Sequence, residues 1–379
     1  MDWHLWDRIE AKIESGRRLS AAEGLLLWDP ELSLHRVGQW ADEVCCRLHG
    51  QVVYYVRNAH LNPTNVCALR CPICAYSRSP GDPDAFCMTV EEVLARAEEA
   101  AKNGCTELHI VGGLHPDKPY RWYRDLLRLI HEAFPTLHLK AWTAVEIAWF
   151  AQQTGRSIRA ILEDLIQVGL GSLPGGGAEI FAPRVRRQIA PRKIDADTWL
   201  AVHREAHRLG LRSNATMLYG HLETPEERID HLIRLRQLQD ETGGFLAFVP
   251  LAFHPARTQL EHLAGPTGLD DLRVMAVSRL LLDNIPHLKA YWVSLGVGTA
   301  QTALAYGAND FEGTVRQERI HHEAGSTAPQ SLSVEEICRL IRQAGRQPVE
   351  RDSLYRPLPA RPAGTSPAPT SAEHAPPPG

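Results

Sequence analysis

Apolar residues follow two patterns that alternate along most of the chain. In the longer segments they recur every three to four positions, as after Thr89, where the repeat ends at Gly104 and predicts an amphipathic helix. Between these segments lie short apolar runs with the length of buried strands. Strands are expected near residues 54–60, 108–111, 137–141, 170–173, 212–218, 245–249, 287–293 and 308–311. Further helices are expected near residues 123–134, 158–168, 269–284 and 299–306.

Helix starts are marked by four Ser/Thr-x-x-Glu sequences. In such a capping box the hydroxyl accepts a hydrogen bond from the third amide of the helix, and the glutamate accepts one from the amide of the cap. The boxes begin at Ser20, Thr89, Thr224 and Ser333. Pro225 follows Thr224 at the first helical position, where its missing N–H costs nothing.

Strands that alternate with helices favour a parallel sheet with helical crossovers. The repeating region, residues 52–315, holds about eight such units, which is the size of one α/β barrel of the (β/α)₈ TIM type. An open doubly wound sheet is the alternative, because periodicity does not show closure. We expect an N-terminal helical extension over residues 1–50, and a barrel with a C-terminal helical closure over residues 51–356. A Pro/Ala-rich tail, residues 357–379, has too few apolar groups to be ordered.

Composition and charge narrow the class of protein. Of the 379 residues, 44% are hydrophobic and 23% are charged, as is usual for soluble globular proteins. The net charge of −4 gives no basic field that would attract nucleic acid or anionic lipid. No apolar run approaches the roughly 20 residues that span a bilayer, and the first residues lack the features of a signal peptide. We therefore expect a cytoplasmic enzyme or binding protein with neither nucleic-acid nor membrane partners.

Three of the eight cysteines lie close together, in the sequence Cys67-Ala-Leu-Arg-Cys71-Pro-Ile-Cys74. This CxxxCxxC spacing follows the first predicted barrel strand, and in a barrel the chemistry belongs to loops at the C-terminal ends of strands. Three thiolates this close can hold a cubane iron–sulfur cluster and leave its fourth iron open to a substrate. A structural zinc site is the alternative, with His60 or Cys87 as the fourth protein ligand that such a site requires.

The cysteine spacing in this position resembles the radical S-adenosylmethionine (SAM) superfamily. The resemblance implies a 4Fe-4S cluster on the three cysteines and SAM as a cosubstrate that chelates the open iron, with no residue assigned as an acid or base. Ile73 departs from the superfamily signature, which has an aromatic residue there. Gly112 and Gly113 resemble the motif that contacts the methionyl amino group. Leu114 stands where many relatives have Glu, so only a backbone contact is expected.

A glycine-rich loop, residues 171–181, carries Glu179 after three glycines. Glycine lets the backbone approach a ligand closely, and the carboxylate could accept hydrogen bonds from ribose hydroxyls or an ammonium group. The structural alternative is a loop that leads into a helix, with Glu179 near the helix start. Thr143 and Glu146, which follow the predicted strand 137–141, are further expected contacts to SAM.

Longer strings narrow the resemblance to one family. The glycine-rich loop, residues 248–255 and residues 289–292 resemble the aminodeoxyfutalosine synthase family, which belongs to the futalosine route to menaquinone. Residues 307–315 are shared with the dehypoxanthine futalosine cyclases and the deazaflavin synthases, which are the alternatives. Two residue pairs, Phe253-His254 and Tyr291-Trp292, match the synthases and differ from the cyclases.

The family resemblance implies a substrate and a reaction. The 5′-deoxyadenosyl radical adds to the double bond of 3-[(1-carboxyvinyl)oxy]benzoate, and rearrangement with loss of carbon dioxide gives 6-amino-6-deoxyfutalosine. A one-electron donor such as flavodoxin or ferredoxin is implied as a partner. The small-molecule substrate carries two carboxylates, which need charged or hydrogen-bonding partners once buried. Candidate contacts at strand ends and in the loops that follow are His60, Arg184, His254, Lys289 and Arg316. Asp310 and Glu318 could orient these cations or the nucleoside, or could cap and pair helices, and of the two neighbouring histidines at 321 and 322 we favour His322.

Overall fold

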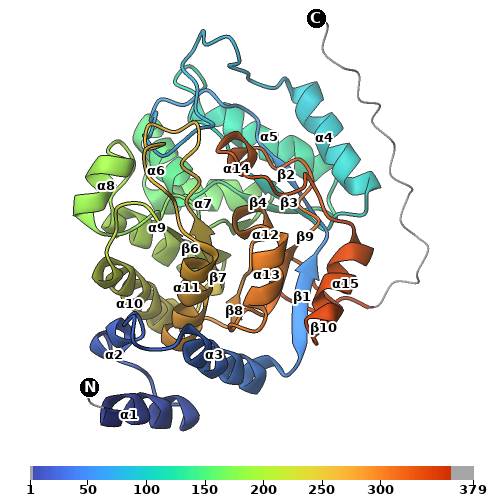
Figure 1. Cartoon of the computed structure of the whole chain (residues 1–379). Coiled ribbons are helices and arrows are strands. Elements are labelled where there is room, and N and C mark those ends of the chain that lie inside the picture. The colour runs from blue at the N-terminus through green and yellow to red at the C-terminus, as the bar shows by residue number, and fades with distance from the viewer. Residues whose placement is uncertain (1–2, 360–379) are drawn as a thin grey trace, which may run out of the picture.

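Seven strands form one parallel sheet in which neighbouring strands follow chain order (Figure 1). The computed structural model describes residues 3–359. The strands are β2 (Asn58–Leu61), β3 (Glu107–Ile110), β4 (His138–Ala141), β5 (Leu170–Leu173), β6 (Arg212–Tyr219), β7 (Phe245–Ala252) and β8 (His287–Leu288). Every connection between successive strands carries at least one helix, because parallel neighbours need a long crossover.

The two outer strands of this sheet meet the same later segment, which begins with β9 (Asp310–Gly313). On one side Lys289, just after β8, forms an isolated parallel bridge with Asp310. On the other side Ala59 of β2 bridges Arg316, and the amide of His60 donates to the Arg316 carbonyl at 2.8 Å. The expected α/β barrel fold is confirmed, and residues 310–316 connect its two edges.

A second, smaller sheet lies beside the barrel. Strand β1 (Val52–Val56) pairs in parallel with β9 on one side and with β10 (Gln347–Glu350) on the other. The single strand predicted over residues 54–60 is wrong, because the chain leaves the smaller sheet after Val56 and enters the seven-stranded sheet at Asn58. Arg57 Nε donates to a Glu350 carboxylate oxygen at 3.0 Å, which fixes the break.

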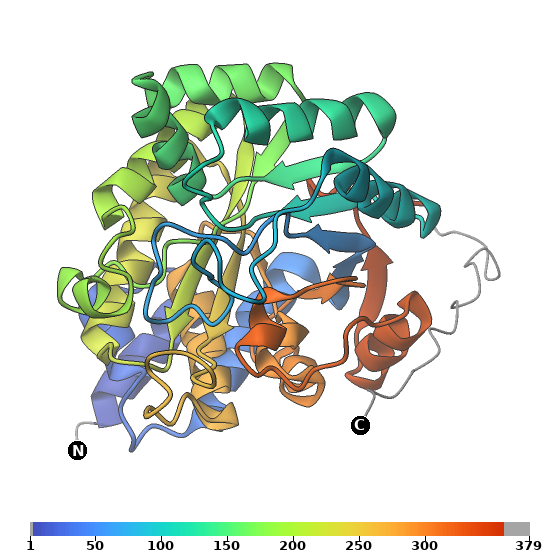
Figure 2. The ribbon, with the colours of Figure 1, turned by 90° about the horizontal axis from the view of Figure 1, so that it is seen from above.

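Helices form an outer layer around the sheet (Figure 2). Those that cross between strands are α4 (Val90–Lys102), α5 (Tyr120–Ala133), α6 (Ala144–Thr154), α7 (Ile158–Gln167), α8 (Pro183–Ile189), α9 (Ala196–Arg208), α10 (Pro225–Thr242) and α11 (Gly268–Leu281). Later in the chain follow α12 (Trp292–Leu295), α13 (Val297–Ala303), α14 (Ile320–Glu323) and α15 (Val334–Gln343). The capping boxes at Ser20, Thr89 and Thr224 are confirmed by both of their hydrogen bonds. Ser333 accepts from the amide of Glu336.

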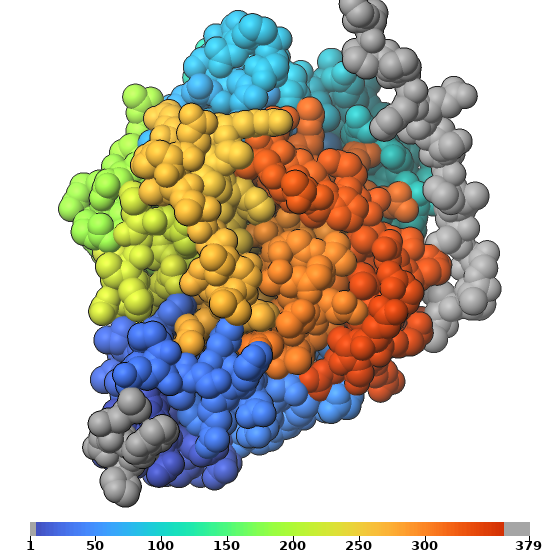
Figure 3. Space-filling view, viewed as in Figure 1, coloured from blue at the N-terminus to red at the C-terminus, as the bar shows by residue number. Residues whose placement is uncertain are grey.

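The N-terminal residues form three helices below the barrel, α1 (Trp3–Glu14), α2 (Ala21–Leu26) and α3 (Leu34–His49). They lie at the end of the molecule opposite to the tip of the β1 arrow, and Figure 3 shows them as a blue surface under the gold and orange parts of the chain. Helix α3 packs on α11, and α2 packs on α10. These helices therefore cover the N-terminal end of the barrel and leave the C-terminal end to the site.

The end of the described chain pairs with β10. Pro357 bridges Arg351, and the amide of Leu358 donates to the Glu350 carbonyl at 2.8 Å. Of the tail predicted to be disordered from residue 357, residues 360–379 lie outside the described residues. No helix within residues 3–359 combines the length and the apolar character needed to cross a membrane.

Candidate active site

A cavity of about 320 Å³ lies where the strands of the barrel end. The loop after β2 contributes all three cysteines of the CxxxCxxC sequence to its wall, and the loop after β5 contributes Glu179. His109 of β3, Lys140 of β4 and Thr216 of β6 also line it. A volume of this size is within the range of ligand sites. The C-terminal end of the strands is also where barrel enzymes place their chemistry.

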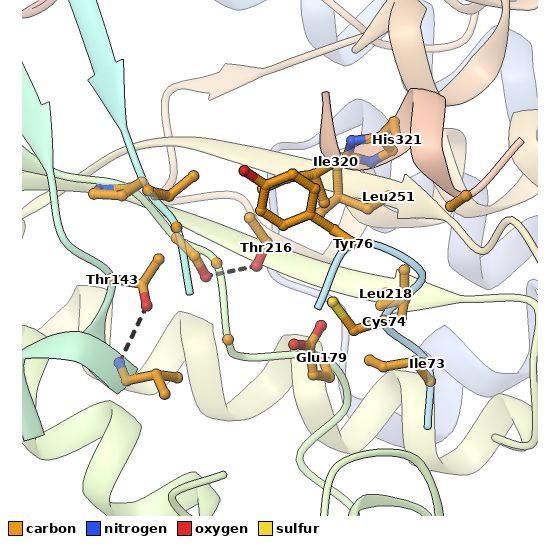
Figure 4. Close-up of a pocket in the computed structure, with 18 of the residues that line it drawn as sticks. Ile73, Cys74, Tyr76, Thr143, Glu179, Thr216, Leu218, Leu251, Ile320 and His321 are labelled. Carbon is orange, nitrogen blue, oxygen red and sulfur yellow. Dashed lines mark hydrogen bonds between the residues drawn. The ribbon is translucent and has the colours of Figure 1, made fainter. Parts of the chain in front are cut away.

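The three thiols face this cavity from one loop. Cys67, Cys71 and Cys74 are free, and Figure 4 shows Cys74, Tyr76 and Glu179 turned toward the same space. Burial raises the pKa of Cys71 to about 11, although the positive charge of Lys193 acts to lower it. A thiol with a raised pKa needs a metal or a cation to become a thiolate, so metal binding would be coupled to loss of its proton.

The three free thiols that line the cavity are the number of protein ligands that a cubane cluster with one open iron needs. Among residues 3–359 no three His, Cys, Asp or Glu side chains are grouped so as to hold a metal ion. A structural zinc ion needs its ligands to converge on one point. In a cubane each thiolate binds a different iron, so the three thiols need not meet at one point as zinc ligands do.

Two glycines fix the cysteine loop against the end of β3. A Cβ atom on Gly113 would lie 2.1 Å from the Val66 carbonyl oxygen, and one on Gly112 would lie 3.0 Å from the Thr64 carbonyl oxygen. The Gly113 amide donates to the Thr64 carbonyl at 2.8 Å. The glycine pair therefore permits a close approach to the backbone of the cysteine loop. Both glycines also line the cavity.

Glu179 sits at the end of the glycine-rich loop in an ion pair with Lys193. Its backbone has a left-handed φ of 47°, and its side chain is buried. Burial alone would raise the pKa of Glu179, but the ammonium group of Lys193 outweighs this effect and keeps the pKa below its ordinary value. The pair therefore presents a permanent carboxylate and a permanent ammonium next to Cys71 and Cys74.

Thr143 and Glu146 line the cavity but also cap α6. The Thr143 hydroxyl accepts from the Val145 amide at 3.2 Å, and Glu146 accepts from the Thr143 amide at 3.1 Å. Burial raises the pKa of Glu146. Their spacing is that of a capping box, and this structural role accounts for both residues without a ligand.

Two further ion pairs are buried in the cavity wall. Lys140 Nζ lies 2.6 Å from a Glu107 oxygen, and Lys289 Nζ lies 2.5 Å from a Glu312 oxygen. Lys193 is paired with Glu179, so each of the three lysines that line the cavity has one carboxylate partner. Unpaired charges this deep would be strongly disfavoured, and these three pairs add no net charge to the wall.

Four histidines, His60, His109, His254 and His321, also line the cavity. The rings of His60 and His109 lie 4.6 Å apart, and burial lowers the pKa of both. Nε2 of His60 is buried without a hydrogen-bond partner among the described residues. His254 Nε2 lies 2.8 Å from the Ser294 carbonyl oxygen. A neutral imidazole with one free nitrogen, as in His60, is available to a ligand.

The structure brings most of the predicted site residues to this cavity. Those that line it are Cys67, Cys71, Cys74, Gly112, Gly113, Thr143, Glu146, Glu179, His60, His254, Lys289 and Glu318. Glu318 is held by the two histidines that follow it, at 3.4 Å from His321 and 2.8 Å from His322.

Four predicted contacts do not line the cavity. Arg184 is half exposed on α8 and forms an ion pair with Glu227 at 2.7 Å. Asp310 is fully buried but accepts from Arg351 at 2.7 Å, away from the cavity. The position of Asp310 in the sequence did not predict the direction of its side chain, which turns toward Arg351 beside the smaller sheet.

Arg316 and His322 also miss the cavity. Arg316 pairs with β2 through its backbone. Its positive charge acts on Cys105, where it opposes the rise in pKa that burial causes, and Cys105 does not line the cavity. His322 is engaged by Glu318 and by the Ala328 carbonyl at 3.1 Å. Its neighbour His321 faces the cavity instead.

The sequence predictions missed polar residues inside the barrel. Glu107 and His109 of β3, Lys140 of β4 and Glu312 of β9 all line the cavity. A signal was present, because charged residues two positions apart in a short apolar strand share its inner face. Lys193 gave no such signal, since it lies in the segment between α8 and α9.

Comparisons with family models cover both halves of the chain. The model of the radical SAM superfamily matches residues 61–235, which contain the cysteine loop, the glycine pair and Glu179. The model described as the CofH/MqnC C-terminal region matches residues 242–363. The two models together span the barrel and the segment that follows it.

Curated relatives match over nearly the whole length. An aminodeoxyfutalosine synthase from Thermus thermophilus is 48% identical over 92% of this chain and 94% of its own length. Another from Streptomyces coelicolor is 44% identical over 94% of this chain and 95% of its own. A 5-amino-6-(D-ribitylamino)uracil–L-tyrosine 4-hydroxyphenyl transferase from Methanopyrus kandleri is 42% identical over 91% of this chain and 94% of its own.

Solved structures share the fold at low sequence identity. Methylornithine synthase superimposes with a TM-score of 0.72 at 18% identity, covering 90% of this chain and 97% of the other. The FeFe-hydrogenase maturase HydG from Carboxydothermus hydrogenoformans gives 0.71 at 17% identity, covering 92% and 80%. Identities of 48% and 44% over more than nine-tenths of the chain, together with the match to the superfamily model, show that the chain belongs to the aminodeoxyfutalosine synthase family of the radical SAM superfamily.

Proposed function

We propose that this enzyme transfers the 5′-deoxyadenosyl group of SAM to 3-[(1-carboxyvinyl)oxy]benzoate and forms 6-amino-6-deoxyfutalosine for menaquinone biosynthesis. The observation that carries the proposal is the place of the residues that separate the synthases from the cyclases. Phe253, His254 and Tyr291 all line the cavity that contains the cysteines. Trp292, the fourth, holds the wall from behind, with its indole N–H donating to the Gly313 carbonyl at 2.9 Å. The family-specific residues therefore lie where a substrate would bind.

Membership of the superfamily implies a 4Fe-4S cluster and SAM. In our proposal Cys67, Cys71 and Cys74 hold the cluster. When bound, the cluster and SAM supply a 5′-deoxyadenosyl radical. The protein's task is then to hold both small molecules close together and to keep water out. Apolar side chains that line the cavity serve this purpose, among them Leu69 and Ile320.

Glu179 and Lys193 are proposed to position SAM. They form a charged pair that acts on Cys71 and Cys74, and their partnership keeps both groups ionised. A zwitterionic ligand can bind to such a pair at little electrostatic cost, because its amino group can pair with Glu179 and its carboxylate with Lys193. Gly112 and Gly113 would add backbone contacts from the opposite wall.

The two substrate carboxylates require partners deeper in the barrel. Lys289 and His60 are the proposed contacts, since Lys289 carries a charge on the wall and His60 has a free ring nitrogen. Burial keeps His60 neutral by lowering its pKa, so it would donate a hydrogen bond and not a proton. Radical addition needs no acid or base at this point, which agrees with the lowered pKa of His60.

The 4-hydroxyphenyl transferase reaction is the competing function, because a transferase of that name is 42% identical to this chain. The two are separated by incubating anaerobic, reconstituted enzyme and SAM with each substrate set. One set is 3-[(1-carboxyvinyl)oxy]benzoate, and the other is L-tyrosine with 5-amino-6-(D-ribitylamino)uracil. We expect 6-amino-6-deoxyfutalosine from the first set by mass spectrometry. Product from the second set alone would overturn the proposal.

A matched pair of variants tests the site assignment in the same assay. Lys289→Gln removes a cavity cation that we propose to contact the substrate, and Arg184→Gln removes a cation outside the cavity. We expect the KM for the benzoate substrate to rise in Lys289→Gln and to stay at the parental value in Arg184→Gln. The opposite pattern would contradict the assignment.

A further inference from the structure

The cysteine loop has a second face. A hollow of about 360 Å³, the outer pocket, lies against residues 70–78 and 257–259. Cys71 and Cys74 line both this outer pocket and the active-site cavity. The stretch of chain that carries these two thiols thus separates the cavity from the outer pocket.

The cysteine loop is held in this position from both sides. The Gln259 amide donates to the Pro72 carbonyl at 3.0 Å, and the Ile73 amide donates to the Ile189 carbonyl at 3.4 Å. In Figure 2 the light-blue cysteine loop accordingly runs next to the gold segment that contains Gln259. These bonds fix the two thiols at the boundary between the two spaces.

Arginines surround the outer pocket. Arg70, Arg78 and Arg257 line it, and Arg192 reaches the edge of the cysteine loop, where it donates to the Ala68 carbonyl at 3.4 Å. Arg78 forms an ion pair with Asp84 at 2.7 Å, whereas Arg70 lies 3.8 Å from the Asp82 carboxylate.

Two of these charges are free. Arg257 and Arg192 are exposed, and neither has a carboxylate within 4 Å among the described residues. The chain as a whole carries a net charge of −4. The lining of the outer pocket, which holds three arginines and no acidic side chain, is therefore a local positive area on an acidic protein.

We propose that the outer pocket is the docking site of a small acidic one-electron carrier protein of the flavodoxin type. The inference rests on the proposed function, in which Cys71 and Cys74 hold the cluster. During turnover SAM and substrate fill the inner cavity, so a protein donor must approach from the other face. One electron passes from the reduced carrier to the cluster site, and no atom is transferred. Complementary charge speeds such encounters and orients them, while keeping the complex short-lived.

Binding tests the proposal directly, with purified acidic flavodoxin as the probe. The variant Arg257→Glu reverses a charge that lines the outer pocket, at a residue outside the catalytic machinery. Arg8→Glu makes the same change on α1, at the opposite end of the molecule. Calorimetry on the reconstituted enzyme should show about tenfold weaker flavodoxin binding in Arg257→Glu and parental affinity in Arg8→Glu. Added salt should weaken binding to the parent. Equal affinities in all three proteins would overturn the proposal.

Turnover with two reductants separates docking from chemistry. We expect Arg257→Glu to lose activity with flavodoxin and to keep parental activity with dithionite, a small reductant that needs no docking surface. Equal losses with both reductants would overturn the proposal, since the arginine would then act on the cluster site itself. If the parent bound flavodoxin through Arg257 but made no product with dithionite, the proposed function would fail and the docking site would stand.

Discussion

The substitution Gly113→Ala tests how the cysteine loop is held. The added Cβ would lie 2.1 Å from the Val66 carbonyl oxygen and 2.7 Å from the Val66 carbonyl carbon. Carbon and oxygen atoms in contact are usually about 3.3 Å apart, so the two backbones must separate by about 1 Å. Neither atom belongs to a flexible side chain that could turn away.

This displacement has a cost in stability and a larger one in function. Overpacking of this kind costs about 1–3 kcal/mol, and here it also strains the hydrogen bond from the Gly113 amide to the Thr64 carbonyl. The loop that moves carries the three thiols. A misplacement near 1 Å at a reacting centre can lower the rate about a hundredfold, so we expect a variant that folds but holds less iron and turns over slowly.

The assay combines thermal unfolding, iron content after anaerobic reconstitution and SAM binding. Gly298→Ala is the matched control, since a Cβ at Gly298 of α13 meets nothing within 4 Å. A glycine-to-alanine change inside a helix should stabilise by up to about 1 kcal/mol and leave the cluster intact. If Gly113→Ala had parental stability, full iron and parental SAM affinity, the argument from close approach would be refuted.

Three further predictions address other parts of the molecule. Glu179→Gln and Glu179→Ala should retain the cluster and weaken SAM binding, with alanine the worse, and unchanged SAM affinity in titrations of both would assign the residue a structural role. Deletion of residues 360–379 should leave turnover near the parental rate, because these residues are poor in core-forming side chains; a large loss in the folded truncation would contradict this. Burial raises the pKa of Asp271 to about 6 while Tyr219 donates to it at 2.7 Å, so the folded state holds this proton more tightly than the unfolded state. Stability is therefore lost as pH rises from about 4 to about 6, by up to about 3 kcal/mol; Asp271→Asn should remove that loss in denaturant unfolding, and identical pH profiles would refute the assignment.

Local signals in the sequence determined much of the fold. Thr89 and Thr224 start helices where their capping boxes predict, because a cap depends only on residues within one turn. The break at Arg57 could not be predicted, since its partner Glu350 is almost three hundred residues further along the chain. The same holds for the path of residues 287–293, where the strand ends at Leu288 and a short helix begins at Trp292.

The site was predictable where a spacing carried the chemistry. The cysteines lie on one loop, so their proximity follows from the sequence alone. The cations were harder to identify, because the direction of a side chain depends on strand register and on distant partners. Arg184 turns outward to Glu227, whereas Lys140, inside an apolar run, turns inward to Glu107.

Iron and acid-labile sulfide per chain test the central claim most directly. The anaerobically reconstituted parent should hold about four of each. Cys67→Ala, Cys71→Ala and Cys74→Ala should each lose the cluster. Cys87→Ala is the control, because Cys87 lies beside the loop, in a bridge with Thr64, and is a ligand only in the zinc alternative. Full iron and sulfide in any of the first three variants, or loss of the metal in Cys87→Ala, would contradict a cluster held by Cys67, Cys71 and Cys74.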